Sequence, residues 1–571
     1  MKHLGKRYWI SGIVLLAGMG IFAFVNGNCQ SFWADELASI GFIRDGLSIP
    51  QVLDTYLYRE NNLPLYPMIL YVIYRIMPYG EKFLLIPSIL FCLAGIVLLA
   101  MTVGKLKGRR AGFLALCMGV SSGVLLWQAA WEIRCYAMAF FLSALVLYTF
   151  AGKCLRPDRK RMLLFSAAVA FCFWTHWFAC ILLFFYGVTD LILVLLRKIS
   201  WKHLLCYVPG CLLFFPWLFA SFYFKRWGLD NYWSDVPEWK DMLWTVLFYL
   251  NGNRILWYLC LLTGAALCVA ALRALRRPYS EDKIKCLLSA FCVVIIGWVI
   301  GVVFVFSRYI DPAGGLFVER YFTVVQPHIL LITTLGLDYI LDWADRLLLR
   351  SKDKPAGFGE DGVQTVKSRR DIWPKAAAWL ARTAVIVLLV SAYVICYRDS
   401  YKAIRKPMEP YREAADYLVK EGKIWSDDCL FMGSNEFCAL DGFVHYYFEK
   451  RGYKAPAHIV DSMVHSKWET RFYPNYTSLT KEELLSYDRI FCLRIHMGMD
   501  EEMKQLLEKY YVQTQDESGV EIWERKGSNS QVTERGIHND RLYCKSNGGK
   551  RADTRFCRDI ERTGGACQKR A

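Results

Sequence analysis

Long apolar blocks separated by short basic loops dominate the first 400 residues of the chain. Blocks of about 17–25 predominantly apolar residues match the hydrocarbon thickness of a bilayer. The clearest of these blocks are 9–25, 83–103, 111–128, 286–306 and 376–397. Because a helix closes its own backbone hydrogen bonds inside lipid, the pattern predicts transmembrane helices.

The basic loops give these helices a direction. Lys and Arg gather in the loops 105–110, 153–161, 197–203, 273–285 and 342–375. An excess of Lys and Arg marks the cytoplasmic side. Placing all five loops and the N-terminus inside predicts eleven spans: 9–25, 83–103, 111–128, 134–150, 162–178, 179–196, 204–223, 255–272, 286–306, 319–341 and 376–397.

One apolar stretch, 63–78, does not fit this alternation. It is short, and it contains three prolines and Arg75. We interpret it as a re-entrant or interfacial helix. Because 63–78 could also cross the membrane, the predicted number of spans is about 11–13. The predicted fold class is a polytopic α-helical membrane protein with a small exterior α/β domain.

The composition of the chain changes near residue 398. Residues 1–397 form the predicted transmembrane domain, and 26–82 form its first exterior loop. In 398–526, PYREAADYLVKEG and EEMKQLLEKYY have helical spacing, whereas CLFMG and RIFCLRI are typical of short buried strands. The basic tail 527–571 lacks apolar periodicity, so we expect it to be disordered.

Net charge alone points to another class of protein. The chain has 571 residues, of which 55% are hydrophobic, and a formal charge of +17, which suggests a nucleic-acid binder. The basic residues lie in loops between apolar blocks, where they set topology. We therefore do not expect the protein to bind nucleic acid. We expect a multi-pass protein of the cell membrane, in contact with membrane lipids. Its N-terminus should be cytoplasmic and its C-terminal domain extracytoplasmic.

The candidate functional residues lie at the predicted outer ends of the spans. Charged residues near or inside a membrane span are energetically costly, so we treat them as candidates for a functional site. Asp35 and Glu36 follow the first span. An adjacent acidic pair can hold a divalent metal ion or supply a general base. Acidic residues are also favourable in the first turn of a helix, so the pair alone also fits a helix start.

Three further groups lie on the same face: Glu132, Arg134 and Tyr136; Glu319, Arg320 and Tyr321; and His176. An arginine fork suits a phosphate, because it makes two charge-assisted hydrogen bonds. Each group also has a structural alternative: an ion pair capping two helices, an interfacial anchor, or a satisfied histidine. Their gathering at one face favours a single site.

At these residues the sequence resembles a known family, the membrane glycosyltransferases of the GT-C fold. In particular, it resembles the bacterial group related to protein O-mannosyltransferases and lipid A aminoarabinose transferases. The resemblance covers roughly residues 5–525. It rests on WADE, NNLPLYPMIL, KLKGRRAGFLAL, WEIRCYA, WTHW, ERYFTVVQP and EPYREAADYL, in this order.

The resemblance implies transfer of a sugar from a polyprenyl-phosphate donor to a lipid, polymer or protein acceptor at the outer face. It makes Asp35 the general base with Glu36 beside it. It also implies that Arg134, Tyr136, Arg320 and Tyr321 hold the carrier phosphate.

The chain departs from the family pattern in two places. Relatives often carry His and a second Pro where this chain has Asn61 and Asn62 before Leu63 and Pro64, so Asn62 is only a site candidate. The acidic pair is DE rather than DxD, which leaves metal dependence open, with Asp35 and Glu36 as the ligands if a metal is used. We assign no other cofactor.

A transporter or flippase of a lipid-linked saccharide is the main alternative. Such proteins place polar groups and broken helices near the bilayer midplane, in repeated halves. No clear repeat is present here, and Asp190 is the main charge near mid-span. A membrane sensor that binds its ligand in 398–526 is a further alternative, but it would not need Asp35, Arg134 and Arg320 together.

Overall fold

The structure is a computed structural model. It describes residues 5–58, 62–225, 236–245, 254–276, 280–312, 316–350, 369–405, 409–433, 439–460, 471–473, 480–495, 499 and 501–527. Residues 528–571 of the tail predicted to be disordered lie outside the described residues. Residues 1–524 form one compact unit.

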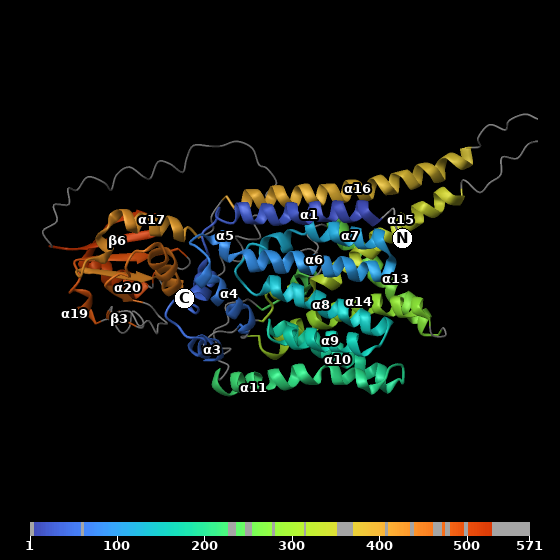
Figure 1. Ribbon diagram of the computed structural model, residues 1–571. Helices are drawn as coiled ribbons and strands as arrows, with labels where there is room; N and C mark the ends of the chain where they lie inside the picture. The colour runs from blue at the N-terminus through green and yellow to red at the C-terminus, as the bar shows by residue number, and fades with distance from the viewer. Residues whose placement is uncertain are drawn as a thin grey trace, which may run out of the picture. The chain divides into compact units, whose positions relative to one another are not determined.

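Among the described residues, eleven helices run roughly side by side as a bundle (Figure 1). They are α1 (Gly5–Asn26), α6 (Ile86–Lys107), α7 (Arg109–Val120), α8 (Tyr136–Leu155), α9 (Arg159–Phe173), α10 (Trp177–Leu195), α11 (Val208–Lys225), α13 (Arg254–Leu275), α14 (Glu281–Val305), α15 (Gln326–Arg350) and α16 (Arg369–Ala403). Each predicted span overlaps one of these helices. Seven helical segments of the described chain are long and apolar enough to cross a membrane, and the predicted fold class of a polytopic helical membrane protein is confirmed.

Four shorter helices follow α1 in the chain. They are α2 (Ala34–Gly41), α3 (Ile49–Tyr58), α4 (Leu65–Ile76) and α5 (Glu81–Leu84). At 12 residues, α4 is about 18 Å long, which is less than the roughly 30 Å of a bilayer core. The stretch 63–78 therefore contains a helix too short to span on its own. Figure 1 shows α3, α4 and α5 at one end of the bundle.

Polar residues begin several bundle helices. Asp158 caps α9 by accepting a hydrogen bond from the backbone N–H of Arg161 at 2.9 Å, and Ser280 caps α14 in the same way at Lys283. Such caps satisfy backbone donors that have no partner inside the helix. They fix where the chain leaves a loop and enters the bundle.

An arginine of the basic loop 105–110 ties three helices together. Arg110, at the start of α7, forms ion pairs with Asp338, Asp342 and Asp345 on one face of α15. Asp345 also pairs with Arg382 of α16. The sequence analysis interpreted the loop 105–110 as a topology signal, whereas the structure also uses Arg110 for helix packing.

A second ion pair is wholly buried. Lys153 of α8 and Asp190 of α10 form an ion pair, and both side chains are fully shielded from solvent. The Tyr207 hydroxyl donates a hydrogen bond to the same Asp190 oxygen at 2.9 Å. The Lys153 ammonium also lies 4.0 Å from the Phe165 ring centre, so the charge is compensated on several sides.

We expect Asp190→Leu to destabilise the bundle strongly. Removing one partner of a buried ion pair typically costs about 3–5 kcal/mol, because the other charge remains buried. The double variant Lys153→Met with Asp190→Leu should recover most of the loss. Thermal unfolding in detergent measures both, with Asp158→Asn as the control, because Asp158 pairs with Arg161 at the surface and exposed pairs contribute only about 0–1 kcal/mol. Equal stability of the single and double variants would contradict this role.

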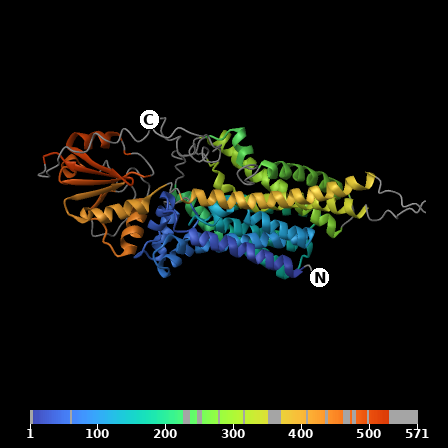
Figure 2. The same ribbon diagram turned by 90° about the horizontal axis from the view of Figure 1, so that it is seen from above.

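The described part of the C-terminal region forms a small α/β domain around a six-stranded sheet. In the order β3-β2-β1-β4-β6-β5, the strands are β3 (Arg471–Tyr473), β2 (His458–Val460), β1 (Cys429–Gly433), β4 (Arg489–Leu493), β6 (Val520–Arg525) and β5 (Tyr511–Glu517). Strands β3, β2, β1 and β4 are parallel, and β6 is antiparallel to β4. Figure 2 shows the orange and red strands as one sheet with helices beside it.

Alternation along β1 shows how the sheet is covered on both faces. Leu430 and Met432 pack with α20 (Glu501–Tyr510) on one face. Phe431 belongs to the core that includes α17 (Tyr411–Glu421) and α18 (Ala439–Phe443) on the other face. Strands buried on both faces are continuously apolar, which is why CLFMG and RIFCLRI could be predicted as strands.

Candidate functional site

The site begins at α2, whose first turn contains the acidic pair. Glu36 is buried, and its two carboxyl oxygens accept hydrogen bonds from the backbone N–H groups of Ile133 at 2.8 Å and Trp33 at 3.2 Å. The first bond joins α2 to the segment before α8. The second closes the N-terminal turn of α2 on itself, as a glutamate at the third helical position commonly does.

Asp35 lies between two arginines from distant parts of the chain. Its Oδ2 atom is 3.1 Å from Nη2 of Arg320 and 3.7 Å from Nη2 of Arg134. The Asp35 side chain is 35% exposed, whereas those of Arg320 and Arg134 are 17% and 10% exposed. A carboxylate open to solvent thus lies against two largely buried cations.

Arg134 is held in place by α2 itself. Its Nη1 donates to the backbone oxygen of Asp35 and to the hydroxyl of Ser39, both at 3.0 Å. Ser39 in turn donates to the same Asp35 oxygen at 2.9 Å. These bonds fix the guanidinium with Nη2 toward the Asp35 carboxylate.

Aromatic rings surround the two arginines. Tyr136 begins α8 and stacks with Tyr321 of the 3-10 turn η6 (Glu319–Val325), with ring centres 6.3 Å apart. His176, the N-cap of α10, contacts Tyr321 at 5.0 Å. The Arg320 guanidinium lies over the Trp33 ring at 4.9 Å. Among the described residues, the buried Tyr136 hydroxyl has no hydrogen-bond partner.

Glu132 adds a second buried carboxyl to the site. Its backbone oxygen accepts a hydrogen bond from Ser88 at 2.6 Å, and Ser88 also contacts the Tyr66 hydroxyl at 2.7 Å. The Oε2 atom of the Glu132 side chain is buried, and it has no hydrogen-bond partner among the described residues.

Burial dominates the titration of these groups. It raises the pKa of Glu132 to about 7, although Arg320 and Arg134 oppose the shift. Burial, together with the negative charge of Glu132, also raises the pKa of Glu36. Burial and the charges of Arg134 and Arg320 lower the pKa of His176 to about 3. At neutral pH, His176 is therefore uncharged and the two arginines are the positive groups of the site.

The structure brings together residues that lie nearly 300 positions apart in the chain. Asp35, Glu36, Glu132, Arg134, Tyr136, His176, Arg320 and Tyr321 all lie around α2 and η6. Asn62 lies at the edge of the group, where its Oδ1 atom accepts from Cys135 Sγ at 3.8 Å. Glu319 begins η6 beside Arg320 and is half-buried.

The sequence analysis missed Trp33, Ser39, Tyr66 and Ser88. Trp33, Ser39 and Ser88 contact predicted residues, and Tyr66 reaches Glu132 through Ser88. None of the four carries a charge that would make it unusual near a membrane. Trp33 and Tyr66 do lie inside the motifs WADE and NNLPLYPMIL, which is the one signal that pointed toward them.

The acidic pair offers little to a metal ion in this arrangement. Both oxygens of Glu36 accept backbone N–H groups, and Asp35 faces two guanidinium groups. Across the described residues, no three His, Cys, Asp or Glu side chains are grouped as metal ligands.

A bundle of this form with a C-terminal α/β domain has the GT-C fold of membrane glycosyltransferases. The solved structures of the aminoarabinose transferase ArnT from Cupriavidus metallidurans are similar to it. The apo form is 14% identical over 90% of this chain and 97% of that chain, with a TM-score of 0.55. The form bound to undecaprenyl phosphate is 15% identical over 92% and 99%, with a TM-score of 0.56. No family model and no curated protein sequence matches the chain.

Proposed function

We propose that the protein is a membrane glycosyltransferase that takes a sugar from a polyprenyl-phosphate carrier. The observation that carries this proposal is the Asp35 carboxylate held between Arg134 and Arg320. Two fixed guanidinium groups suit a phosphate, and a carboxylate beside them suits proton removal. The fold supports it, since ArnT was solved with undecaprenyl phosphate bound.

The reaction we propose is a single displacement at the anomeric carbon. An acceptor hydroxyl attacks this carbon and gives its proton to Asp35. The bond between the anomeric carbon and the phosphate oxygen breaks, and its electron pair stays on the carrier phosphate. Arg134 and Arg320 stabilise that developing charge, and the sugar is transferred with inversion.

Donor binding must rearrange the ion pairs of the site. In the structure, Arg320 and Arg134 are paired with Asp35. A carrier phosphate that takes over these arginines releases the carboxylate. The freed carboxylate then accepts the proton of the acceptor hydroxyl.

The remaining residues have supporting roles in this proposal. Glu36 positions α2 against Ile133 rather than exchanging protons with substrate, because both its oxygens accept backbone N–H groups. Tyr136 and Tyr321 border the phosphate position, and the unpartnered Tyr136 hydroxyl donates to it. The neutral His176 forms part of the aromatic wall.

The basic loops indicate how the protein is oriented in the membrane. We infer that the N-terminus faces the cytoplasm and that α2 to α5 and the C-terminal domain face the outside, because the loops 105–110, 153–161, 197–203 and 273–285 are basic. The acceptor is then a lipid, a polymer or a protein outside the membrane.

Donor binding is expected to tighten as the pH falls through 7. Below this value Glu132 is mostly neutral, and it no longer offsets the charges of Arg134 and Arg320. A phosphodiester donor, whose charge is constant here, should bind roughly tenfold more tightly at pH 6 than at pH 8, the change given by a coupling of about one pKa unit. Direct binding of a short-chain polyprenyl-phosphate sugar measures this.

Glu132→Gln should remove that pH dependence and keep the tighter affinity at both values. Asp45→Asn is the matched control, because Asp45 is an exposed carboxylate of the same region. An unchanged pH profile in Glu132→Gln would show that another group titrates.

The experiment that tests the function uses the purified protein in membranes of defined lipids. A polyprenyl-phosphate donor with a labelled sugar is added together with candidate acceptors, and products are separated from donor. Release of label from the carrier, as glycosylated acceptor or as free sugar from attack by water, supports the proposal. Movement of intact donor across the membrane without cleavage would favour the flippase instead.

A further inference from the structure

The helix α2, which contains Asp35, is covered by the C-terminal α/β domain at very close range. A Cβ atom added to Gly442 of α18 would lie 1.7 Å from the backbone oxygen of Leu37 in α2. A Cβ atom on Gly41 would lie 3.1 Å from the backbone nitrogen of Gly442. The two helices therefore cross backbone against backbone, and glycine at 442 permits this approach.

Hydrogen bonds from the same domain hold the N-terminal end of α2. The Glu409 carboxylate accepts from the Ala34 backbone N–H at 2.7 Å, which is one of the donors that a helix leaves unsatisfied in its first turn. Just before α2, the Tyr447 hydroxyl accepts from the Phe32 backbone N–H at 3.0 Å. The domain thus caps the Ala34 N–H, whereas Glu36 within α2 caps that of Trp33.

The other end of α2 is fixed by a buried ion pair. Arg44 pairs with Asp441 of α18, and both side chains are less than 10% exposed. Arg44 also donates to the backbone oxygen of Gly41 at 3.0 Å, the last residue of α2. The ion pair therefore joins the C-terminal end of α2 to the residue that precedes Gly442.

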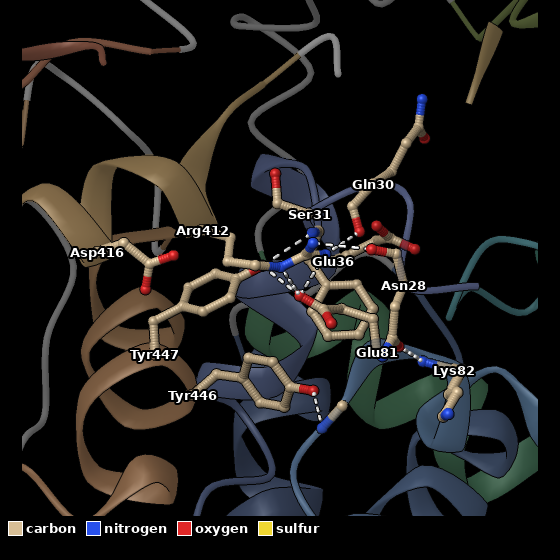
Figure 3. Close-up of polar contacts among 12 residues, drawn as sticks. Asn28, Gln30, Ser31, Glu36, Glu81, Lys82, Arg412, Asp416, Tyr446 and Tyr447 are labelled. Atoms are coloured by element: carbon tan, nitrogen blue, oxygen red, sulfur yellow. Dashed lines mark hydrogen bonds and ion pairs between the residues drawn. The ribbon is translucent and has the colours of Figure 1, made fainter. Parts of the chain in front are cut away.

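A third set of contacts holds the loop that leads into α2 (Figure 3). Arg412 of α17 pairs with the buried Glu81 at 2.8 Å and donates to the backbone oxygen of Asn28 at 2.8 Å. The Tyr447 hydroxyl also donates to Glu81 at 3.2 Å. These contacts join α5 and residues 28–32 to the domain.

Isolated helices shorter than about 12–15 residues are marginal in water, and α2 has only 8 residues. It needs external contacts to keep its shape, and its contacts with Ile133 and Arg134 fix only the face toward the bundle. We propose that the C-terminal domain is a positioning element of the active site, which holds α2 so that Asp35 meets the reacting hydroxyl beside Arg320. This proposal rests on the transferase function proposed above.

Loosening α2 should affect catalysis and donor binding to different extents. Arg320 and Tyr321 belong to η6, which continues into the bundle helix α15, so loosening α2 leaves their part of the phosphate site in place. Arg134, which lies just before the bundle helix α8, loses only its hydrogen bonds to α2. Proton removal by Asp35 depends on α2 directly, and misplacing a reacting group by about 1 Å can cost roughly 100-fold in rate. A loosened α2 should therefore lower kcat much more than it weakens donor binding.

The test compares two glycine variants of the full-length protein in lipid. Gly442→Ala places a methyl group against the α2 backbone. Gly433→Ala is the matched control in the same domain, because the nearest atom to its Cβ would be in the Leu440 side chain, at an ordinary van der Waals distance of 3.5 Å. Hydrogen exchange of the 34–41 amides reports whether α2 is held, and thermal unfolding reports whether the protein stays folded.

We expect Gly442→Ala to speed exchange in α2 at least tenfold and to lower kcat by about 10–100-fold, with the affinity for polyprenyl phosphate within about threefold of wild type. Gly433→Ala should match wild type. Glu409→Ala should loosen α2 as well, whereas Glu409→Gln, which keeps an acceptor for Ala34, should restore most of the rate. This pair keeps the test informative if Gly442→Ala fails to fold.

Three results would overturn the proposal: unchanged exchange in α2, unchanged kcat despite faster exchange, or equal losses in kcat and carrier affinity. If the wild-type protein transfers no sugar from any carrier, the transferase function fails instead. The exchange of the 34–41 amides then still decides whether the domain holds α2.

Discussion

Replacing Asp35 with asparagine is expected to stop sugar transfer and, at the same time, to make the protein bind the carrier phosphate more tightly. General-base catalysis typically contributes about 10²–10⁴-fold, and an amide cannot accept the proton at neutral pH. The same carboxylate competes with phosphate for Arg320 and Arg134. Because partly exposed ion pairs contribute up to about 1 kcal/mol, affinity should rise by about two- to fivefold.

Single-turnover transfer and direct binding of polyprenyl phosphate measure the two effects separately. Asp45→Asn serves as the control, because it also removes one negative charge near α2 but at an exposed position. Weaker phosphate binding in Asp35→Asn would show that Asp35 does not compete for the arginines. Retained transfer would remove it from the mechanism.

Loss of Arg320 is expected to have an effect of similar size by a different route. The Arg320 side chain is 17% exposed, so its charge acts on the leaving phosphate with little screening by water. Removing one such preorganised contact typically costs roughly 10²–10³-fold in rate. Arg320→Ala should also weaken binding of the carrier phosphate, whereas Arg320→Lys should restore part of the binding but little of the rate, because an ammonium does not make the paired contacts of a guanidinium.

The control for this series is Arg398→Ala. Arg398 is exposed and pairs with its neighbour Asp399, so its loss should leave transfer unchanged. Titration with polyprenyl phosphate and single-turnover transfer again provide the measurements. An Arg320→Ala protein with normal carrier affinity would mean that the phosphate lies elsewhere.

The bundle could be predicted from the sequence because bilayer thickness imposes a simple length rule on apolar blocks. The stretches 83–103 and 286–306, for example, largely coincide with α6 (Ile86–Lys107) and α14 (Glu281–Val305). The ends of the helices were less predictable: 204–223 corresponds to α11 at Val208–Lys225. Apolar composition changes gradually at such ends, whereas capping and packing decide the first and last residue.

The candidate site was partly predictable for a related reason. Charges such as Asp35, Arg134 and Arg320 are conspicuous beside apolar blocks, because burying them is costly. Their mutual distances were not predictable, since no local pattern links positions 35 and 320. Glu409 shows the limit: it caps α2 across 375 positions, and a glutamate in a polar segment looks like any solvated side chain.

The contacts between α2 and the C-terminal domain have a consequence for the synthesis of the protein. Their partners are separated by 375 to 415 positions, which a ribosome at about 5–20 residues per second covers in roughly 20–80 s. Throughout that interval the helix with the proposed base is already made, while the domain that holds it does not yet exist. If the domain positions α2, nascent and truncated chains are inactive, and only completed chains consume the lipid-linked donor.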